Sequence, residues 1–191
     1  MSKISVLMSV YKKENPEYLR ASLESVLVQT RTADEILLIE DGPLTQELYQ
    51  VVAEYQKKCD YLHVHAMEQN VQLGRALAKG VELCQYDLIA RMDTDDIAMP
   101  DRLEKEEAYM EAHPEVDVVG GAIREFNDEG TIDRVKNMPK TQEEILEYVK
   151  VRNPLNHMTV MYRKDSILKA GNYKHFPFLE DYSLWSRMLS Q

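Results

Sequence analysis

The feature that most constrains the fold is a regular alternation of short apolar segments with longer amphipathic segments over the first 92 residues. The short segments are rich in β-branched residues, as buried strands are, and cover residues 4–10, 35–39, 61–66 and 86–92. Between them, apolar side chains recur every three or four positions, which is the spacing of one helix face. The alternation predicts an α/β fold with a mostly parallel central sheet.

Helix start signals support this interpretation. Asn15 and Pro16 are a typical cap and first-turn proline for the first helix, and Thr45 is a typical cap for the second. The expected apolar stripe of the third helix consists of Leu73, Leu77, Val81 and Cys84.

After residue 100 the alternation becomes irregular. We expect a charged helix over residues 101–113, a strand over 116–123, a short helix after the capping box of Thr141 and Glu144, and a strand over 156–162. The sequence stops at Gln191 within an amphipathic helical pattern and without a stop signal, so we expect the protein to continue. Without repeats or flexible linkers, we expect one domain over residues 1–191.

Composition narrows the class of partner. The chain has 33 acidic and 23 basic side chains and a formal net charge of -10, which counts against a nucleic-acid partner or an anionic membrane surface. No apolar stretch reaches about 18 residues, so we expect no transmembrane helix and a cytoplasmic location. Cys59 and Cys84 match no metal-binding spacing and are expected to be buried, reduced thiols.

The strongest local signal is Asp93, Thr94, Asp95 and Asp96 at the end of the fourth apolar segment. Three carboxylates in four residues repel one another unless a cation lies among them, and Mg²⁺ or Mn²⁺ prefers such oxygen ligands. The alternative is a solvated acidic turn before the helix that follows Pro100. The position directly after a buried strand favours the metal.

Other polar residues also follow predicted strands, where ligand sites of parallel sheets lie. Ser9 and Tyr11 end the first strand, and Asp41 ends the second, although Tyr11 can be a packing residue and Asp41 a turn residue. Arg75, in the first turn of the third helix, can meet a phosphate or remain a surface arginine. Residues 1–100 are therefore interpreted as a nucleotide-binding portion and residues 101–191 as the portion that completes the cleft.

Near the end of the sequence, Glu180 and Asp181 follow an aromatic and proline segment. A carboxylate there can act as a general base if partial burial raises its pKa, or it can simply cap the last helix. His157 stands alone in the sequence, so a zinc site or a Ser-His-Asp arrangement has little support, and a structural histidine is the simpler interpretation.

Together these residues resemble the family 2 glycosyltransferases, inverting enzymes with the Rossmann-like, three-layer α/β/α fold called GT-A. The resemblance lies in ISVLMSVYKKE, ILLIEDG, LIARMDTDDIAMPDRLEKE, NHMTVMYRK and LEDYSLWSRM, which occur in the family's order over nearly the whole chain. It implies transfer of a sugar from a nucleotide-diphosphate donor, expected to be a UDP-sugar, to a saccharide acceptor, as in the synthesis of bacterial capsule, exopolysaccharide or lipopolysaccharide.

The resemblance also implies roles for individual residues. Ser9 and Tyr11 would line the nucleotide pocket, Asp41 would bind uracil, and Asp93 would lie near the ribose. Asp95, together with Asp93, would hold Mn²⁺ or Mg²⁺, and the adjacent Asp96 would share this task. Asp181 would be the catalytic base. A lipid-linked saccharide acceptor and peripheral association with the inner membrane face follow from the family context.

Some features depart from the family pattern. Pro43 stands where Ser is common, Gln72 stands where Gly is frequent, and no QxxRW element is present, which argues against a processive synthase. Two other functions stay open at this point. A phosphatase of the haloacid dehalogenase type also uses an Asp pair, although after its first strand, and a noncatalytic nucleotide-sugar binder would need only the nucleotide pocket.

Overall fold

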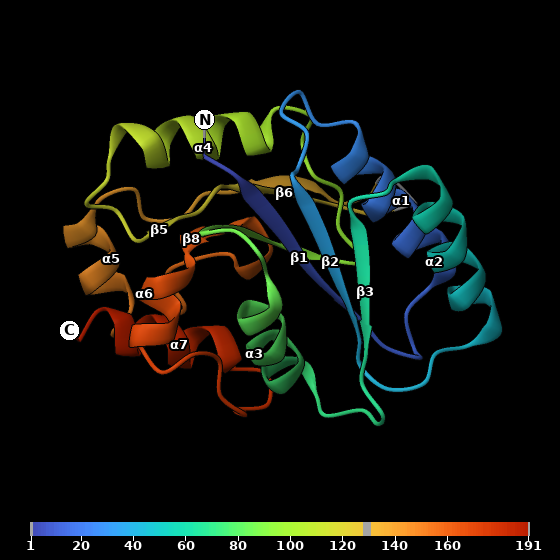
Figure 1. Ribbon diagram of the computed structural model, residues 1–191. Coiled ribbons are helices and arrows are strands. Elements are labelled where there is room, and N and C mark those ends of the chain that lie inside the picture. The colour runs from blue at the N-terminus through green and yellow to red at the C-terminus, as the bar shows by residue number, and fades with distance from the viewer. Residues whose placement is uncertain (1, 128–130, 191) are drawn as a thin grey trace.

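The computed structural model describes residues 2–127 and 131–190, and its centre is a six-stranded sheet with strand order β3-β2-β1-β4-β8-β5 (Figure 1). Four strands run parallel: β1 (Ile4–Val10), β2 (Glu35–Glu40), β3 (Leu62–Ala66) and β4 (Leu88–Asp93). The short β8 (Met161–Arg163) runs antiparallel to both β4 and β5 (Val118–Val119). The predicted sheet is confirmed, with an antiparallel addition that the alternation did not indicate.

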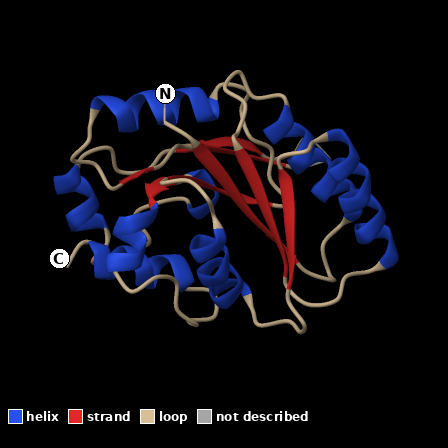
Figure 2. Ribbon diagram, in the orientation of Figure 1, coloured by secondary structure: helices blue, strands red, loops and turns tan. Residues whose placement is uncertain are grey.

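Helices cover both faces of this sheet (Figure 2). The helices on one face are α1 (Pro16–Leu27), α2 (Gln46–Lys58) and α4 (Arg102–Ala112). Those on the other face are α3 (Leu73–Leu83), α6 (Lys164–Lys169) and α7 (Glu180–Met188). Each face has its own apolar core, because successive side chains of a strand point to opposite sides: Val6 and Met8 enter one core, and Leu7 enters the other.

The predicted caps explain where the first helices begin. The Asn15 side chain accepts a hydrogen bond from the Glu17 N–H, and the Thr45 hydroxyl accepts one from the Leu48 N–H. These bonds satisfy backbone groups that a helix terminus leaves without an intrahelical partner. The capping box of Thr141 is also confirmed, and it opens α5 (Gln142–Tyr148).

Two predicted strands of the second half are wrong in their extent. The segment 116–123 forms only the two residues of β5, and after Gly120 and Gly121 the chain turns into β6 (Ile123–Phe126). β6 pairs with β7 (Asp133–Lys136) in a separate two-stranded sheet, and hence its apolar residues do not extend the central sheet.

The expected strand over 156–162 is also wrong in its first part. Asn156 instead precedes a short 3-10 helix, η1 (His157–Thr159), and strand geometry begins only at Met161. The Asn156 side chain donates to the Gly121 carbonyl at 3.1 Å, so it ties this turn to the glycine segment rather than starting a strand ladder.

Cys59 and Cys84 are buried free thiols, as predicted. Within residues 2–127 and 131–190, no helix combines the length and apolar character that crossing a membrane would need.

Candidate functional site

The carboxyl ends of β1, β2 and β4 meet at one edge of the sheet, where the sequence places its polar strand ends. In the strand register Ser9 lies opposite Asp93 on one side and Ile39 on the other. The Asp41 N–H donates to the Val10 carbonyl at 2.8 Å, so the turn after β2 is joined to the end of β1. The structure therefore brings together Ser9, Asp41 and Asp93 from three separate strand ends.

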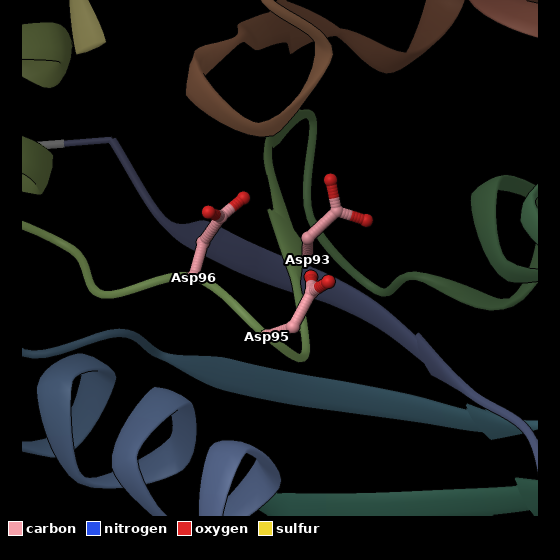
Figure 3. Close-up of side chains that lie close together, drawn as sticks. All are labelled: Asp93, Asp95 and Asp96. Atoms are coloured by element: carbon pink, nitrogen blue, oxygen red, sulfur yellow. The ribbon is translucent and has the colours of Figure 1, made fainter. Parts of the chain in front are cut away.

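The turn after β4 gathers three carboxylates. One oxygen from each of Asp93, Asp95 and Asp96 lies within 4.8 Å of the others, and Figure 3 shows the three side chains leaving this turn. Burial, together with the charges of Asp93 and Asp95, raises the pKa of Asp96 to about 6. The pKa of Asp95 is also raised, first by burial and then by Asp93 and Glu14. Mutual repulsion makes this a place where a cation is stabilised.

Neighbouring side chains hold the backbone of this turn in place. The Ser22 hydroxyl of α1 donates to the Asp93 carbonyl at 2.7 Å, and the Thr94 hydroxyl donates to the Glu14 carboxylate at 2.6 Å. The Ala98 N–H donates to the Ser25 hydroxyl at 3.0 Å. These bonds from the first connection and helix preorganise the acidic turn before any ligand arrives.

Arg91 is a site residue that the sequence interpretation missed. Its side chain is buried within β4 and forms an ion pair with Asp93. A signal was present, because Arg91 is a charged residue inside an apolar strand and shares the face of the strand with Asp93 two positions later. A guanidinium beside Asp93 orients that carboxylate and leaves Asp95 and Asp96 as the less compensated pair.

This set of oxygen donors fits a divalent cation. Mg²⁺ and Mn²⁺ are bound by one or two carboxylates together with substrate phosphates and water, and they need no complete protein cage. The three clustered carboxylates offer those ligands, and the charges of Asp93 and Asp95 add to burial in raising the pKa of Asp96.

Asp41 is held more tightly than an open base-binding carboxylate would be. Its Oδ1 accepts from the Val71 N–H at 2.6 Å, and its Oδ2 accepts from the Asn70 side chain at 2.8 Å. Burial raises the pKa of Asp41, whereas the N–H groups of Val71 and Gln72 lower it. No local pattern indicated that residues 70–72 would hold this carboxylate. Its oxygens keep lone pairs for a ligand.

The other predicted nucleotide residues lie around this edge. Tyr11 directly follows β1, and 44% of it is exposed, which leaves its ring accessible. Arg75 is exposed in the first turn of α3. That turn packs closely on the end of the chain, because a Cβ added at Gly74 would lie 2.8 Å from the Cγ of Glu180.

Asp181 lies in the first turn of α7, although Leu179 and not Asp181 is the N-cap residue. Its Oδ1 accepts from the Tyr182 N–H at 2.7 Å, and its Oδ2 accepts from the Asn153 side chain. Burial raises the pKa of Tyr173, and the charges of Asp181 and Asp93 raise it further, whereas Arg91 lowers it. The charges of Asp181 and Asp93 therefore both act on this one buried hydroxyl.

His157 packs into the same interior. Its Nε2 lies 2.9 Å from the Tyr173 hydroxyl, and its ring meets Trp185 edge-on at 6.3 Å. Burial lowers the pKa of His157 well below its ordinary value, and the Arg91 charge adds to this effect. A neutral, hydrogen-bonded histidine agrees with the structural interpretation.

The model of the family described as "Glycosyl transferase family 2" matches residues 5–174. The chain belongs to this family. The expected resemblance is thus confirmed over nearly all of the sequence, including the segments that carry the acidic turn and Asp41.

Two similar proteins match almost the whole chain. The amylovoran biosynthesis glycosyltransferase AmsE of Erwinia amylovora is 45% identical over 97% of this chain and 69% of its own length. A UDP-Gal:alpha-D-GlcNAc-diphosphoundecaprenol beta-1,3-galactosyltransferase of Escherichia coli is 34% identical over 98% of this chain and 68% of its own length.

Two solved structures share the fold. TarS 1-349 of S. aureus in complex with UDP-GlcNAc has a TM-score of 0.77 and 19% identity, and the match covers 98% of this chain and 53% of that chain. The mannosyltransferase PcManGT of Pyrobaculum calidifontis, in complex with GDP-Man and Mn2+, has a TM-score of 0.76 and 12% identity, covering 98% and 52%. The expected GT-A fold is confirmed, and the chain spans about half the length of these solved chains.

One departure from the family pattern has a visible structural effect. Gln72 stands where the family often has Gly, and its backbone has φ 70° and ψ 157°, a region that almost only glycine adopts. The fold thus keeps a glycine conformation at a residue with a side chain, directly beside the loop that holds Asp41.

Proposed function

We propose that the protein transfers a sugar from a UDP-sugar to a hydroxyl of a saccharide acceptor, with inversion, in the synthesis of a bacterial cell-surface polysaccharide. The observation that carries this proposal is the cluster of three carboxylates in the turn after β4, in a chain of glycosyl transferase family 2. The named relatives support the pathway, since one acts in amylovoran biosynthesis and another uses UDP-Gal.

The nucleotide would occupy the edge of the sheet formed by the ends of β1, β2 and β4. Tyr11 offers an accessible ring for stacking on a base, and Asp41 offers carboxylate lone pairs to a base N–H. Ser9 and Asp93 lie next to each other in the register and face the ribose in this arrangement. Arg75, exposed on α3, is the residue we assign to the diphosphate.

Asp95 and Asp93 would hold Mg²⁺ or Mn²⁺, with Asp96 beside them. Such an ion, when bound, neutralises charge on the departing diphosphate. The chain's own contribution is positional, because Ser22 and Arg91 fix Asp93 while Asp95 remains exposed toward a ligand.

Asp181 is the group we assign as general base. The hydrogen bonds from Asn153 and from the Tyr182 N–H fix the orientation of its carboxylate. From there it would accept the proton of the acceptor hydroxyl as that oxygen bonds to the anomeric carbon and the bond to UDP breaks. A single displacement of this kind inverts the anomeric configuration.

The test is calorimetric titration of UDP with and without Mn²⁺, on the wild-type protein, Asp95→Ala and the exposed control Asp60→Ala. We expect Mn²⁺-dependent binding in the wild type and in Asp60→Ala, and its loss in Asp95→Ala. Equal binding by all three proteins would contradict the assignment of Asp95.

Turnover then separates the other functions. UDP release from a UDP-sugar in the presence of acceptor supports the transferase. Tight UDP binding without turnover of any UDP-sugar would indicate a noncatalytic binder, and phosphate release from sugar phosphates without acceptor would indicate the phosphatase.

A further inference from the structure

The segment that joins α6 to α7 ends in a tight turn directly before α7. The Leu179 N–H donates to the Phe176 carbonyl at 2.8 Å, so residues 176–179 form a β-turn with Pro177 and Phe178 at its centre. The backbone φ of Phe178 is 68°. A proline followed by a residue with positive φ is the arrangement of a type II turn, whose second central position normally holds glycine.

The phenyl ring of Phe178 makes almost no contact with the rest of the chain. It is 95% exposed, the largest exposed fraction among the large apolar side chains that the structure describes. Leu179 is the N-cap of α7, and an apolar residue just before an N-cap often packs against the fourth residue of the helix. That residue is Ser183, so Phe178 lacks this stabilising contact. Burial therefore does not offset the cost of an aromatic residue at positive φ.

Positive φ values concentrate around this turn and around the loop that holds Asp41. The described residues with positive φ are Gly42, Gln72, Gly171, Asn172 and Phe178. The first turn of α3 joins the two places, because a Cβ added at Gly74 would lie 2.5 Å from the Lys174 carbonyl oxygen. Figure 1 shows the segment between α6 and α7 running beside the start of α3. Strained backbone gathered in this way is typical of ligand-binding sites.

We propose that the Phe178 ring is a platform on which a pyranose ring of the acceptor saccharide stacks, so that Phe178 selects and positions the acceptor beside Asp181. The inference rests on the proposed transferase function and adds a residue that determines acceptor binding. Three residues of chain span at most about 11 Å, so the ring stands within one or two sugar units of the proposed base. The C–H groups of a pyranose face pack on an aromatic ring, while the hydroxyls stay free for Asp181.

The turn holds this ring ready for a ligand. Pro177 fixes its own φ at about −65°, and the hydrogen bond of Leu179 closes the turn. A phenylalanine side chain has only two torsions, so ordering it on binding costs little entropy. The position three residues before Asp181 favours a sugar as the occupant, and the net charge of -10 counts against an anionic bilayer.

Phenylalanine NMR tests the stacking directly, because the chain contains three phenylalanines, Phe126, Phe176 and Phe178. With ring-¹³C phenylalanine, Phe178→Tyr identifies the Phe178 resonances. The probes are methyl β-D-glucoside, methyl β-D-galactoside and methyl N-acetyl-β-D-glucosaminide, with the open-chain polyol sorbitol as the control. At least one pyranoside should shift the Phe178 resonances, and sorbitol at equal concentration should not.

Variants give the magnitude. Phe178→Leu keeps an apolar side chain and removes the ring, so it should weaken binding of that pyranoside about tenfold, measured by saturation transfer to the sugar protons. Phe178→Tyr keeps the ring and should bind like the wild type. Tyr86→Leu, before the opposite end of β4, is the control for loss of an aromatic ring away from the site. In the transfer assay Phe178→Leu should raise KM for the acceptor and leave KM for the UDP-sugar unchanged.

Stability separates a binding role from a structural one. Phe178→Gly removes both the ring and the strain, so it should raise the thermal midpoint by about 2–4 °C while it weakens pyranoside binding. A residue that only supports the fold would lower both. A lower midpoint for Phe178→Gly would therefore overturn the proposal, because it would show that the ring stabilises the chain itself.

Three binding results would also overturn the proposal: no Phe178 shift with any of the pyranosides, an equal shift with sorbitol, or a stronger response to phosphatidylglycerol vesicles than to every pyranoside. The last result would make the turn a membrane contact. These titrations do not involve UDP, so intact Mn²⁺-dependent UDP binding without a Phe178 shift would refute only the platform, whereas absent UDP binding would refute the transferase.

Discussion

Two parts of the chain form the site, a first part up to residue 100 and a second part after it. They differ in how closely their elements are packed. Strand β2 is buried at every position, and β1 is buried at six of its seven positions. By contrast, α5 and β7 contain no buried residue. The acidic turn and Asp41 thus stand on a closely packed core, whereas β7 and α5, which precede Asp181 in the sequence, are lightly packed.

This difference shows that the site residues of the two parts are supported by elements of different packing density. The first part positions the nucleotide and metal residues through long parallel strands, which tolerate little change in volume. The second part supplies the proposed base, and its elements outside the central sheet and the core, β6, β7 and α5, can vary without disturbing the sheet. Substitutions in the two parts should therefore fail in different ways.

The largest expected effect is a loss of activity, without a loss of stability, on substitution of a residue of the second part. Asp181→Asn should lower kcat by about 10²–10⁴, because an amide cannot take the proton of the acceptor hydroxyl. The remaining carbonyl oxygen can still accept from Asn153, so UDP binding and the unfolding midpoint should stay near wild type. Initial transfer rates, UDP titration and urea unfolding measure the three quantities.

The exposed acid Asp165 of α6 provides the matched control. Asp165→Asn should leave kcat unchanged. Transfer by Asp181→Asn at near the wild-type rate would remove Asp181 from the role of base, and a large drop in its unfolding midpoint would remove the contrast between the two parts.

The second prediction compares one apolar residue from each part. Leu38→Ala, in the centre of β2, should lower the free energy of unfolding by about 2–5 kcal/mol, because it leaves a cavity in a closely packed core. Val135→Ala, on β7, should change it by less than about 0.5 kcal/mol, since 62% of Val135 is exposed. Urea denaturation of both variants checks the contrast, and equal losses would contradict it.

The same contrast explains how much could be predicted from the sequence. The first part follows from local patterns, since strands 4–10 and 35–39 and the caps Asn15 and Thr45 agree with the structure to within a residue. Long buried strands and amphipathic helices repeat one pattern, and local preference and burial act in the same direction.

The predictions for the second part failed where tertiary contacts determine the secondary structure. Gly120 and Gly121 gave no sign of where β5 would end, and the antiparallel pairing of β8 depends on strand β4, about 70 residues earlier. The acidic turn was found because three carboxylates are adjacent in sequence. Arg91 was visible only as a charge inside an apolar strand, and Asn153, which holds Asp181 from 28 residues away, had no local signal.

The third prediction concerns two positions near Asp41 whose backbone φ is positive. Gly42 has φ 84°, and an added Cβ would lie 2.5 Å from the Asn70 backbone nitrogen, so Gly42→Ala should destabilise the protein by about 1–3 kcal/mol and weaken UDP binding. Gln72→Gly should do the reverse and stabilise it by about 1 kcal/mol, since glycine adopts φ 70° without strain. Thermal unfolding measures both, and a destabilised Gln72→Gly would show that the side chain contributes more than its backbone strain costs.

The smallest expected effect is a pH dependence from the buried interior where the two parts meet. Burial, and then the Arg91 charge, lowers the pKa of His157 well below its ordinary 6.5. Below pH 6.5 the unfolded chain therefore binds a proton that the folded chain does not, and the free energy of unfolding should fall by up to about 1.4 kcal/mol per pH unit. Asp96, whose pKa is raised to about 6, acts in the opposite direction, because its folded form binds a proton first as the pH falls.

The difference between wild type and His157→Gln, measured by urea unfolding from pH 7.5 to 5, isolates the histidine. Wild type should lose stability relative to the variant below pH 6.5, with the exposed His175→Gln as the control for loss of an imidazole. Parallel curves would mean that His157 binds protons equally in both states and that the interior between Arg91 and Tyr173 is open to water.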